Sequence, residues 1–250
     1  MKYSLTFVLF AFLLASCAKQ LTIYTIGDST MANKPQPEKN PERGWAQMLP
    51  EYFDQSVTIV NKAVNGRSTR SFLKENRWDS IYQKLQKGDY VFIQFGHNDG
   101  KTTDSTRYTN PHVSYRQNLI RFVEETRQKG ARPILFTSIA RRNFNEQGAL
   151  IDTHGDYTLV TRLVAQEYKV PLIDLQYFTE IMEETYGREN SKKLHLHFAA
   201  GEHEFYPEGK ADNTHLSVLG ATKIAQHAAL ELYAKDKRLR KRILKVKIGD

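Results

Sequence analysis

Residue types suited to nucleophilic chemistry follow apolar segments of this 250-residue chain. Ser29 lies in the segment GDST (27–30), directly after an apolar run, where a sharp turn can present a serine hydroxyl above the end of a strand. Asp212 and His215 are three residues apart, so the carboxylate can fix the imidazole tautomer while the other ring nitrogen faces a hydroxyl. In chain order these residues form a Ser, Asp, His set, which predicts a serine nucleophile with its base.

Two further turns carry glycine next to small polar residues, NGRS at 65–68 and GHND at 96–99. Glycine lets the backbone turn sharply and lets a bound molecule approach closely. Taken alone, each segment has an ordinary explanation: an Asx turn for 27–30, a turn glycine at Gly66, a helix cap for 96–99 and a surface loop for 212–215. Ser68 is better explained as a helix cap than as a second nucleophile.

The spacing of apolar residues predicts the elements that would hold these turns. Short runs rich in β-branched and aromatic residues predict five strands, at 21–26, 57–61, 90–95, 133–137 and 170–173. Segments with helical periodicity lie between them: the clearest runs from 111 to 129 with Asn110 as N-cap, and another begins after Ser217 as N-cap. Apolar strands that alternate with helices predict an α/β fold, a three-layer α/β/α sandwich with a five-stranded parallel sheet. Ligands of such sheets bind beyond the carboxyl ends of the strands, which is where the polar turns lie.

The four polar segments together, in this order, resemble the SGNH or GDSL hydrolase family. The sequence resembles the rhamnogalacturonan acetylesterase branch of that family over five segments: 25–31, 43–45, 65–72, 94–99 and 212–216. The resemblance implies a flavodoxin-like SGNH hydrolase fold, which we place at residues 18–234. The stretch 191–210 and the C-terminal end have no match to the branch that we can assign.

The resemblance also implies a chemistry and the residues that carry it. Ser29 would be the nucleophile, His215 the general base and Asp212 its orienting carboxylate. The oxyanion hole would be formed by the backbone N–H groups of Ser29 and Gly66 and the side-chain amide of Asn98. The expected enzyme is a serine esterase that removes acetyl groups from a pectic polysaccharide through an acyl-enzyme, with no cofactor and no metal.

Five residues beside the motifs are candidates for contact with the sugar. Arg43 could hold a sugar carboxylate and Trp45 could stack on a sugar ring. Arg67 and Arg70 flank Gly66 and could meet a uronate carboxylate, while His97 could pack or donate a hydrogen bond behind the reacting groups. Each of four residues also has an ordinary explanation. Trp45 could be a buried core residue and Arg43 a surface arginine, and solvation at a helix start explains Arg67 and Arg70 nearly as well.

The segment 195–204 contains three histidines and two glutamates. His195, His197 and His203, with Glu202 and Glu204, have a spacing that could suggest a metal site. His195 and His197 alternate along a strand-like run, and no cysteine joins them. A loop that touches sugar hydroxyls, or plain surface structure, explains the segment better than a metal does.

The first seventeen residues have the pattern of a signal peptide. Lys2 precedes a run of apolar residues from 5 to 15 that is too short to span a bilayer, and Leu14 to Cys17 resemble a lipoprotein cleavage box. We expect cleavage before Cys17, a lipid anchor on that cysteine, and export to the bacterial periplasm or the outer membrane. A plain secretory signal is the alternative. Cys17 is the only cysteine, which excludes an internal disulfide.

Composition is that of a globular protein, with 40% hydrophobic and 26% charged residues. Of the net charge of +8, the stretch 235–250 contributes eight Lys and Arg against two Asp, so the body is nearly neutral. We expect this basic tail to be a solvated extension or to touch anionic lipid or polyuronate, and the export signal argues against nucleic acid. We expect a monomer whose partner is an acetylated acidic polysaccharide or oligosaccharide.

Two other functions fit the same motifs. A lysophospholipase or thioesterase of the same superfamily would need an apolar acyl channel, whereas the motif loops here are polar. A carbohydrate-binding lipoprotein could keep the fold without turnover, because a fold alone does not establish activity.

Overall fold

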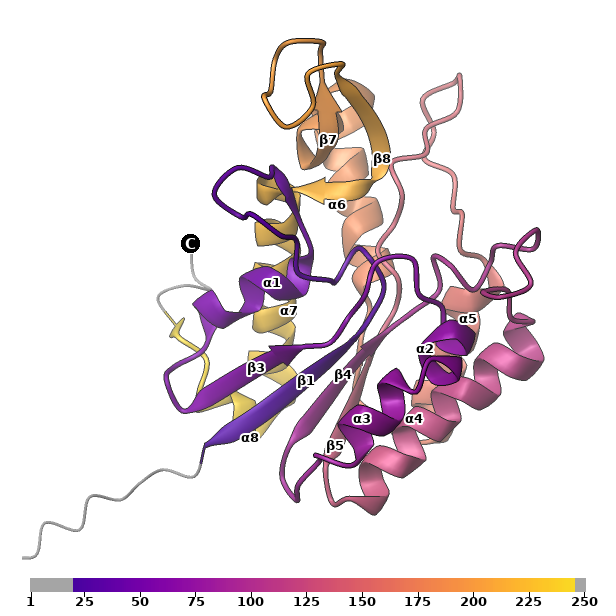
Figure 1. Cartoon of the computed structure of the whole chain (residues 1–250), viewed down its shortest axis with the longest axis vertical. Helices are drawn as coiled ribbons and strands as arrows, with labels where there is room; N and C mark the ends of the chain where they lie inside the picture. The colour runs from indigo at the N-terminus through magenta and orange to yellow at the C-terminus, as the bar shows by residue number, and fades with distance from the viewer. Residues whose placement is uncertain (1–19, 246–250) are drawn as a thin grey trace, which may run out of the picture.

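The computed structural model describes residues 20–245 and has a parallel β-sheet at its centre (Figure 1). Its five strands are all parallel and lie in the order β3-β1-β4-β5-β6. Numbered along the chain, this order is 2-1-3-4-5, the flavodoxin-like arrangement, so the predicted sheet is confirmed. The strands are β1 (Leu21–Gly27), β3 (Val57–Asn61), β4 (Tyr90–Gln94), β5 (Arg132–Phe136) and β6 (Leu172–Ile173).

Helices cover both faces of this sheet, which confirms the three-layer sandwich (Figure 1). One face packs against α2 (Thr69–Lys74), α3 (Arg77–Tyr82), α4 (Arg116–Gln128) and α5 (Asp156–Glu167). The other packs against α1 (Trp45–Met48), α6 (Leu175–Asn190), α7 (Val218–Lys235) and α8 (Lys237–Arg240).

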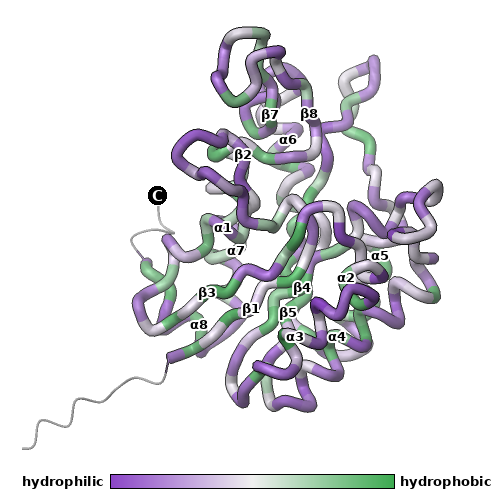
Figure 2. The backbone as a smooth tube through the Cα atoms, viewed as in Figure 1, coloured by the Kyte–Doolittle hydropathy of each residue, from purple (hydrophilic) through white to green (hydrophobic). Residues whose placement is uncertain are grey.

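Alternation of side chains along each strand divides the interior into two cores. Along β1, Ile23 belongs to the core under α7, while Ile26 belongs to the core under α4. β4 is buried along its whole length, as its apolar sequence predicts for a central strand. Figure 2 shows hydrophobic residues following β1 and β4 through the middle of the molecule.

The predicted helix caps are present. The Asn110 side chain accepts hydrogen bonds from the N–H groups of His112 and Val113, and the Ser217 side chain accepts one from Gly220. The helix expected at 111–129 begins as a π-helical turn (Pro111–Tyr115) and continues as α4. Ser68 caps α2 in a reciprocal capping box with Ser71, as expected.

A second, antiparallel sheet lies beyond the end of the main sheet, and the sequence did not predict it. Its order is β2-β8-β7, with β2 at Glu42–Arg43, β7 at His195–Phe198 and β8 at Lys210–Ser217. Two 3₁₀ helices lie near these strands in sequence. Leu49–Tyr52 comes after β2 and α1, and Ser191–Leu194 directly precedes β7. The segment 212–215, expected as a loop, is therefore part of a strand.

The expectation of a solvated basic tail is wrong for residues 236–245. Leu239 is fully buried and Ile243 is 5% exposed, because both pack into the core under α7. The backbone also pairs with the start of the domain: the Asp54 N–H donates to the Arg242 carbonyl, and the Leu244 N–H donates to the Tyr52 carbonyl. Apolar residues spaced along the basic segment hold it on the body. No helix among residues 20–245 is apolar over enough length to cross a membrane.

Candidate active site

Ser29 lies in the tight turn that follows β1. The buried Asp28 carboxylate shapes this turn, since its Oδ1 accepts hydrogen bonds from the N–H of Thr30 at 2.9 Å and from the Thr30 hydroxyl at 2.8 Å. Ser29 itself is 8% exposed and lies on the wall of a cavity. The turn therefore presents one hydroxyl to a cavity and buries its neighbours.

A bulge in β8 brings Asp212 to His215. Asp212 is paired with Leu196, and Leu216 is paired with His195, so three residues of β8 lie opposite a single step of β7. Within this bulge the N–H groups of Thr214 and His215 donate to Asp212 Oδ1 at 2.8 and 3.0 Å. The other oxygen, Oδ2, lies 2.8 Å from His215 Nδ1.

The structure brings the three predicted residues together. His215 Nε2 lies 3.0 Å from Ser29 Oγ, with Asp212 on the opposite nitrogen of the ring. Burial opposes ionisation of Asp212, but the hydrogen bonds from His215 and from the two N–H groups outweigh it and hold the pKa of this carboxyl below its ordinary value. Asp212 is therefore ionised at neutral pH, as a residue that orients an imidazole must be.

Three side chains hold the bulge in place, and two of them, Arg142 and His195, are buried. Arg142, 7% exposed, donates from Nη1 to Asn213 Oδ1 at 3.0 Å, and its N–H donates to the Asn213 carbonyl at 2.9 Å. His197 Nε2 lies 2.8 Å from the same Asn213 oxygen. His195 Nε2 lies 2.6 Å from Glu183 Oε1, and its Nδ1 lies 3.3 Å from the His215 carbonyl.

These contacts assign a structural role to His195 and His197. Both rings support the segment that carries His215, and within residues 20–245 no cluster of three or more His, Cys, Asp or Glu side chains is arranged to hold a metal ion. The loop after β7, with His203, remains a predicted site of sugar contact.

The donors predicted for an oxyanion surround the serine. Gly66 has a φ of +77°, a left-handed conformation that suits glycine, and it lines the same cavity as Ser29 and Asn98. Asn98 Nδ2 donates one hydrogen to the Arg67 carbonyl at 3.1 Å, which orients the amide and leaves its second hydrogen for a ligand. In the part of the chain that the structure describes, the N–H groups of Ser29 and Gly66 donate to no protein acceptor.

The cavity has a volume of about 590 Å³ and an entirely polar lining apart from glycine. Three cations from three different segments face it: Lys101, Arg141 and Lys210. The full lining consists of Ser29, Glu42, Asn65, Gly66, His97, Asn98, Lys101, Arg141, Lys210, Asp212, Thr214 and His215. Such a lining suits a polar ligand with negative charge.

His97 supports the site from below, as one of its predicted roles requires. Its Nδ1 lies 3.3 Å from Asp28 Oδ2, and its ring packs edge-on against His154 with centroids 4.4 Å apart. Burial lowers the pKa of His97 and lowers that of His154 further, which favours the neutral rings. The Arg141 guanidinium donates to the His97 carbonyl at 3.1 Å. This hydrogen bond links Arg141, a cation of the cavity, to the turn that contains His97 and Asn98.

The predictions that Trp45 and Arg43 contact a sugar are wrong. Trp45 is fully buried: its indole N–H donates to Gln94 and its ring packs on Phe136 at 5.2 Å. The Arg43 guanidinium donates to the backbone carbonyls of the preceding loop, those of Pro37, Asn40 and Glu42. Trp45 therefore packs in the apolar core, and Arg43 holds the backbone of the preceding loop.

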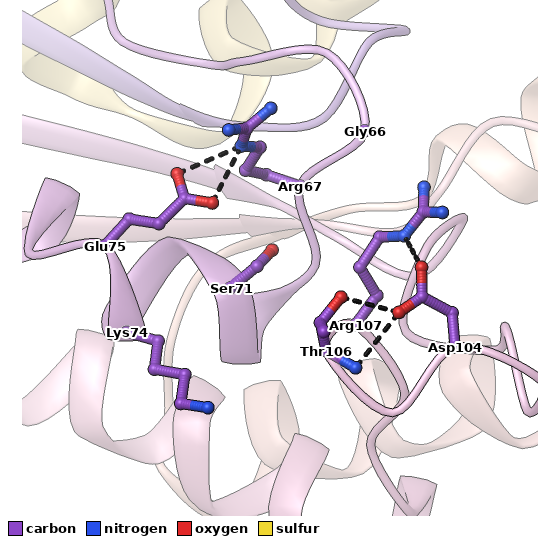
Figure 3. Close-up of a pocket in the computed structure, with 8 residues that line it drawn as sticks. All are labelled: Gly66, Arg67, Ser71, Lys74, Glu75, Asp104, Thr106 and Arg107. Atoms are coloured by element: carbon purple, nitrogen blue, oxygen red, sulfur yellow. Dashed lines mark hydrogen bonds and ion pairs between the residues drawn. The ribbon is translucent and has the colours of Figure 1, made fainter.

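Arg67 and Arg70 do not line the cavity of Ser29 either. Arg70 donates to the Ser105 carbonyl at 3.2 Å. Arg67 points to the other side of the Gly66 turn, where its Nε donates to both oxygens of Glu75 in an adjacent cavity (Figure 3). Arg67 and Arg70 therefore lie outside the cavity in which Ser29 would react.

Lys34 is a site residue that sequence reasoning missed. Its side chain is 1% exposed, and its Nζ lies 2.7 Å from the Ser29 carbonyl, 2.8 Å from Asn65 Oδ1 and 2.7 Å from Glu42 Oε1. The ammonium thus joins the serine turn, the Gly66 turn and β2. A lysine in a polar loop has no periodicity that would single it out, so only the folded chain reveals this role.

Known proteins resemble this chain over most of its length. The GDSL-like Lipase/Acylhydrolase family matches residues 25–223. The chain belongs to this family. It is 40% identical over 211 residues to the rhamnogalacturonan acetylesterase RhgT of Bacillus subtilis, covering 84% of this chain and 89% of RhgT. It is 32% identical over 212 residues to the probable rhamnogalacturonan acetylesterase YesY of the same organism, covering 83% and 90%.

A solved structure supports the same family fold. The crystal structure of YxiM from Bacillus subtilis superposes with a TM-score of 0.74 at 26% identity. The match covers 87% of this chain and 57% of the YxiM chain. Family membership and the arrangement of Ser29 and His215 make this GDSL family member an esterase.

Proposed function

We propose that this esterase removes acetyl groups from a pectic polysaccharide by way of an acyl-enzyme on Ser29. The observation that carries the proposal is the 3.0 Å approach of His215 Nε2 to Ser29 Oγ inside a cavity with three cations. Ser29 Oγ attacks the ester carbonyl while His215 accepts its proton, and Asp212 stabilises the imidazolium that forms.

The negative charge of the tetrahedral intermediate falls on one oxygen. The N–H groups of Ser29 and Gly66 and the free hydrogen of Asn98 Nδ2 are the donors for it, since all three residues line one cavity. Collapse of the intermediate breaks the bond to the sugar oxygen, which takes the proton from His215 and leaves as the alcohol. Water, deprotonated by His215, then attacks the acetyl-serine and releases acetate.

The cations indicate the class of sugar. Lys101, Arg141 and Lys210 line the cavity of Ser29 and outnumber its two carboxylates, Glu42 and Asp212. A uronate carboxylate beside the acetyl group is a partner that these cations can bind by charge-assisted hydrogen bonds. The similarity to RhgT, an enzyme named for rhamnogalacturonan, supports the same substrate class.

The polar lining argues against a long acyl chain. The cavity with a mostly apolar lining, about 300 Å³ near Phe178 and Leu230, lies between α6 and α7 and does not include Ser29. We therefore expect a decanoyl ester to react at least about 100-fold more slowly than an acetyl ester, because the acyl site is short and polar.

The test is acetate release from acetylated rhamnogalacturonan, acetylated homogalacturonan and acetylxylan in parallel. Release from a pectic substrate that is lost in Ser29→Ala, with an unchanged circular dichroism spectrum, is the expected result. Faster release from xylan would overturn the pectic substrate. An active Ser29→Ala variant would overturn the acyl-enzyme, and a wild-type protein that binds the sugars without turnover would overturn the enzyme.

We also propose that the protein is exported and lipid-anchored through Cys17, which lies outside the described residues. β1 begins at Leu21 and runs for seven residues, about 23 Å, before it reaches the serine turn. The described chain therefore enters the sheet at the end away from the catalytic cavity. Palmitate labelling in cells that is lost in Cys17→Ser is the expected result; labelling that persists would contradict the anchor.

A further inference from the structure

A second cavity, of about 430 Å³, lies beside the cavity of Ser29. Figure 3 shows the residues that line it. The two share Gly66, while Asn65 lines only the cavity of Ser29 and Arg67 only the second one, so the turn at 65–67 lies between them. Asn98, on the serine side, donates to the carbonyl of Arg67, whose side chain lies on the other side. A chain molecule bound at the serine therefore reaches the second cavity by crossing one turn.

Three cations line the second cavity: Arg67, Lys74 and Arg107. Figure 3 shows that the Arg107 side chain extends toward Gly66, and its Nη1 would lie 3.7 Å from a Cβ placed on that glycine. Among residues 20–245 no hydrogen bond or ion pair occupies Lys74 Nζ or the Nη atoms of Arg107. These donors are free to bind a ligand.

Two carboxylates in the cavity are already engaged. Glu75 accepts from Arg67 Nε and also pairs with Arg77, while Asp104 accepts from Arg107 Nε. These pairs use the Nε edge of each guanidinium and leave the outer nitrogens of Arg107 to the cavity. With three cations against two carboxylates in the lining, the cavity is net positive.

Two hydroxyl residues, Ser71 and Thr106, complete the lining, so every residue of the lining is polar or glycine. Their hydroxyls are engaged within the protein, since Ser71 Oγ donates to the Ser68 carbonyl and Thr106 Oγ1 donates to Asp104. A cavity of this size, lined by charged and polar residues with an excess of cations, suits a sugar that bears a carboxylate better than a hydrophobic group.

We infer that the second cavity is a binding site for a second uronate residue of the substrate chain, beyond the sugar that carries the acetyl group. Arg107 binds its carboxylate through the outer nitrogens that face the Gly66 turn, Lys74 adds positive charge to the same cavity, and the 65–67 turn separates this sugar from the one at Ser29. The inference rests on the proposed pectic substrate, and it explains how a polymer gains affinity beyond the acyl site.

The test measures binding of a rhamnogalacturonan oligosaccharide without acetyl groups, so that turnover plays no part. We expect the double variant Lys74→Ala/Arg107→Gln to bind about tenfold more weakly, as the loss of two partly solvated charge contacts predicts. Its kcat on p-nitrophenyl acetate, which is too small to span both cavities, should not change. Lys74→Arg, which keeps the charge, should keep the affinity.

A matched control distinguishes the loss of contacts in the cavity from the effect of a lower net charge. Lys84→Ala/Arg132→Gln makes the same change in charge at exposed positions that line neither cavity, and it should bind like the wild type. Equal weakening in both double variants, or none in Lys74→Ala/Arg107→Gln, would overturn the site. A methyl-esterified oligosaccharide that still distinguishes the wild type from that variant would overturn recognition of the carboxylate. If the wild type binds this oligosaccharide yet releases acetate only from xylan, the proposed substrate fails while the site stands.

Discussion

His215 Nε2 lies 3.0 Å from Ser29 Oγ although 186 residues separate the two in the chain. β1 delivers the serine to one edge of the main sheet, and the bulge in β8 delivers the imidazole from the second sheet. Because the two groups belong to different sheets, their distance depends on every contact that holds those sheets together.

Asp212→Asn should lower kcat by about 10⁴-fold, because an amide cannot hold the imidazole in the tautomer that accepts the serine proton. The asparagine Oδ1 can still accept from the N–H groups of Thr214 and His215, so the bulge should persist. Steady-state kinetics on p-nitrophenyl acetate, with a melting curve as control, would check this. A loss of less than tenfold in kcat would contradict the role of the carboxylate.

Asn98→Ala should lower kcat by a factor of about 100 to 1,000 and leave KM nearly unchanged, because the amide is needed most when the oxyanion forms. The substitution also removes one hydrogen bond to the Arg67 carbonyl, so the melting temperature should be measured beside the kinetics. A rise in KM with kcat intact would show that Asn98 binds the ground state instead.

Lys34→Met should lower kcat by about 10- to 100-fold, because it frees the Ser29 carbonyl and the Asn65 side chain to move. It also leaves Glu42 without its ion pair, which should lower stability. The double variant Lys34→Met/Glu42→Gln removes that unpaired charge, so it should recover stability while kcat stays low. Recovery of kcat together with stability would show that Lys34 acts only through folding.

Asp99 should make stability depend on pH in a direction unusual for a carboxylate. Burial raises the pKa of Asp99 from about 3.8 to about 7, against the hydrogen bonds from Thr69 and Thr109. Between these values the folded state holds a proton that the unfolded state has lost, so this residue lowers the free energy of unfolding as pH rises from about 4 to about 7. Above that range its contribution is constant.

Asp99→Asn keeps an acceptor oxygen at the same place and cannot titrate. The difference in unfolding free energy between the wild type and this variant, measured by urea denaturation at several pH values, should therefore change with pH in that window and be flat above it. A difference that is the same at every pH would show that the carboxyl has an ordinary pKa.

Leu239→Ala should lower the free energy of unfolding by about 2 to 5 kcal/mol, because it removes a fully buried side chain from the core. Leu244→Ala is the matched control: the same change in the same segment, at a side chain that is 39% exposed, should cost about 0.5 kcal/mol. Urea unfolding would measure both. Equal effects would mean that the C-terminal segment does not belong to the folded domain.

Local signals in the sequence determined the main sheet and its caps. Each of the five strands is an apolar run that pairs with its neighbours in parallel, and Asn110 and Ser217 cap helices through atoms only a few residues away. Ser29 could be named in advance because it follows a parallel strand, where ligands of such sheets bind. Asp212 and His215, which lie in the antiparallel sheet, could be named from their spacing and because the four motifs occur together in order.

Tertiary structure decided how those residues are held and what surrounds them. β2 is two residues long and carries no periodicity, the bulge of β8 depends on pairing with β7, and Lys34 acquires its role from Ser29, Glu42 and Asn65 at once. Trp45 and Leu239 are buried because distant elements cover them. Periodicity and capping report on neighbours in the chain, whereas burial, charge pairing and the approach of two sheets depend on contacts between residues far apart, which exist only after the chain has folded.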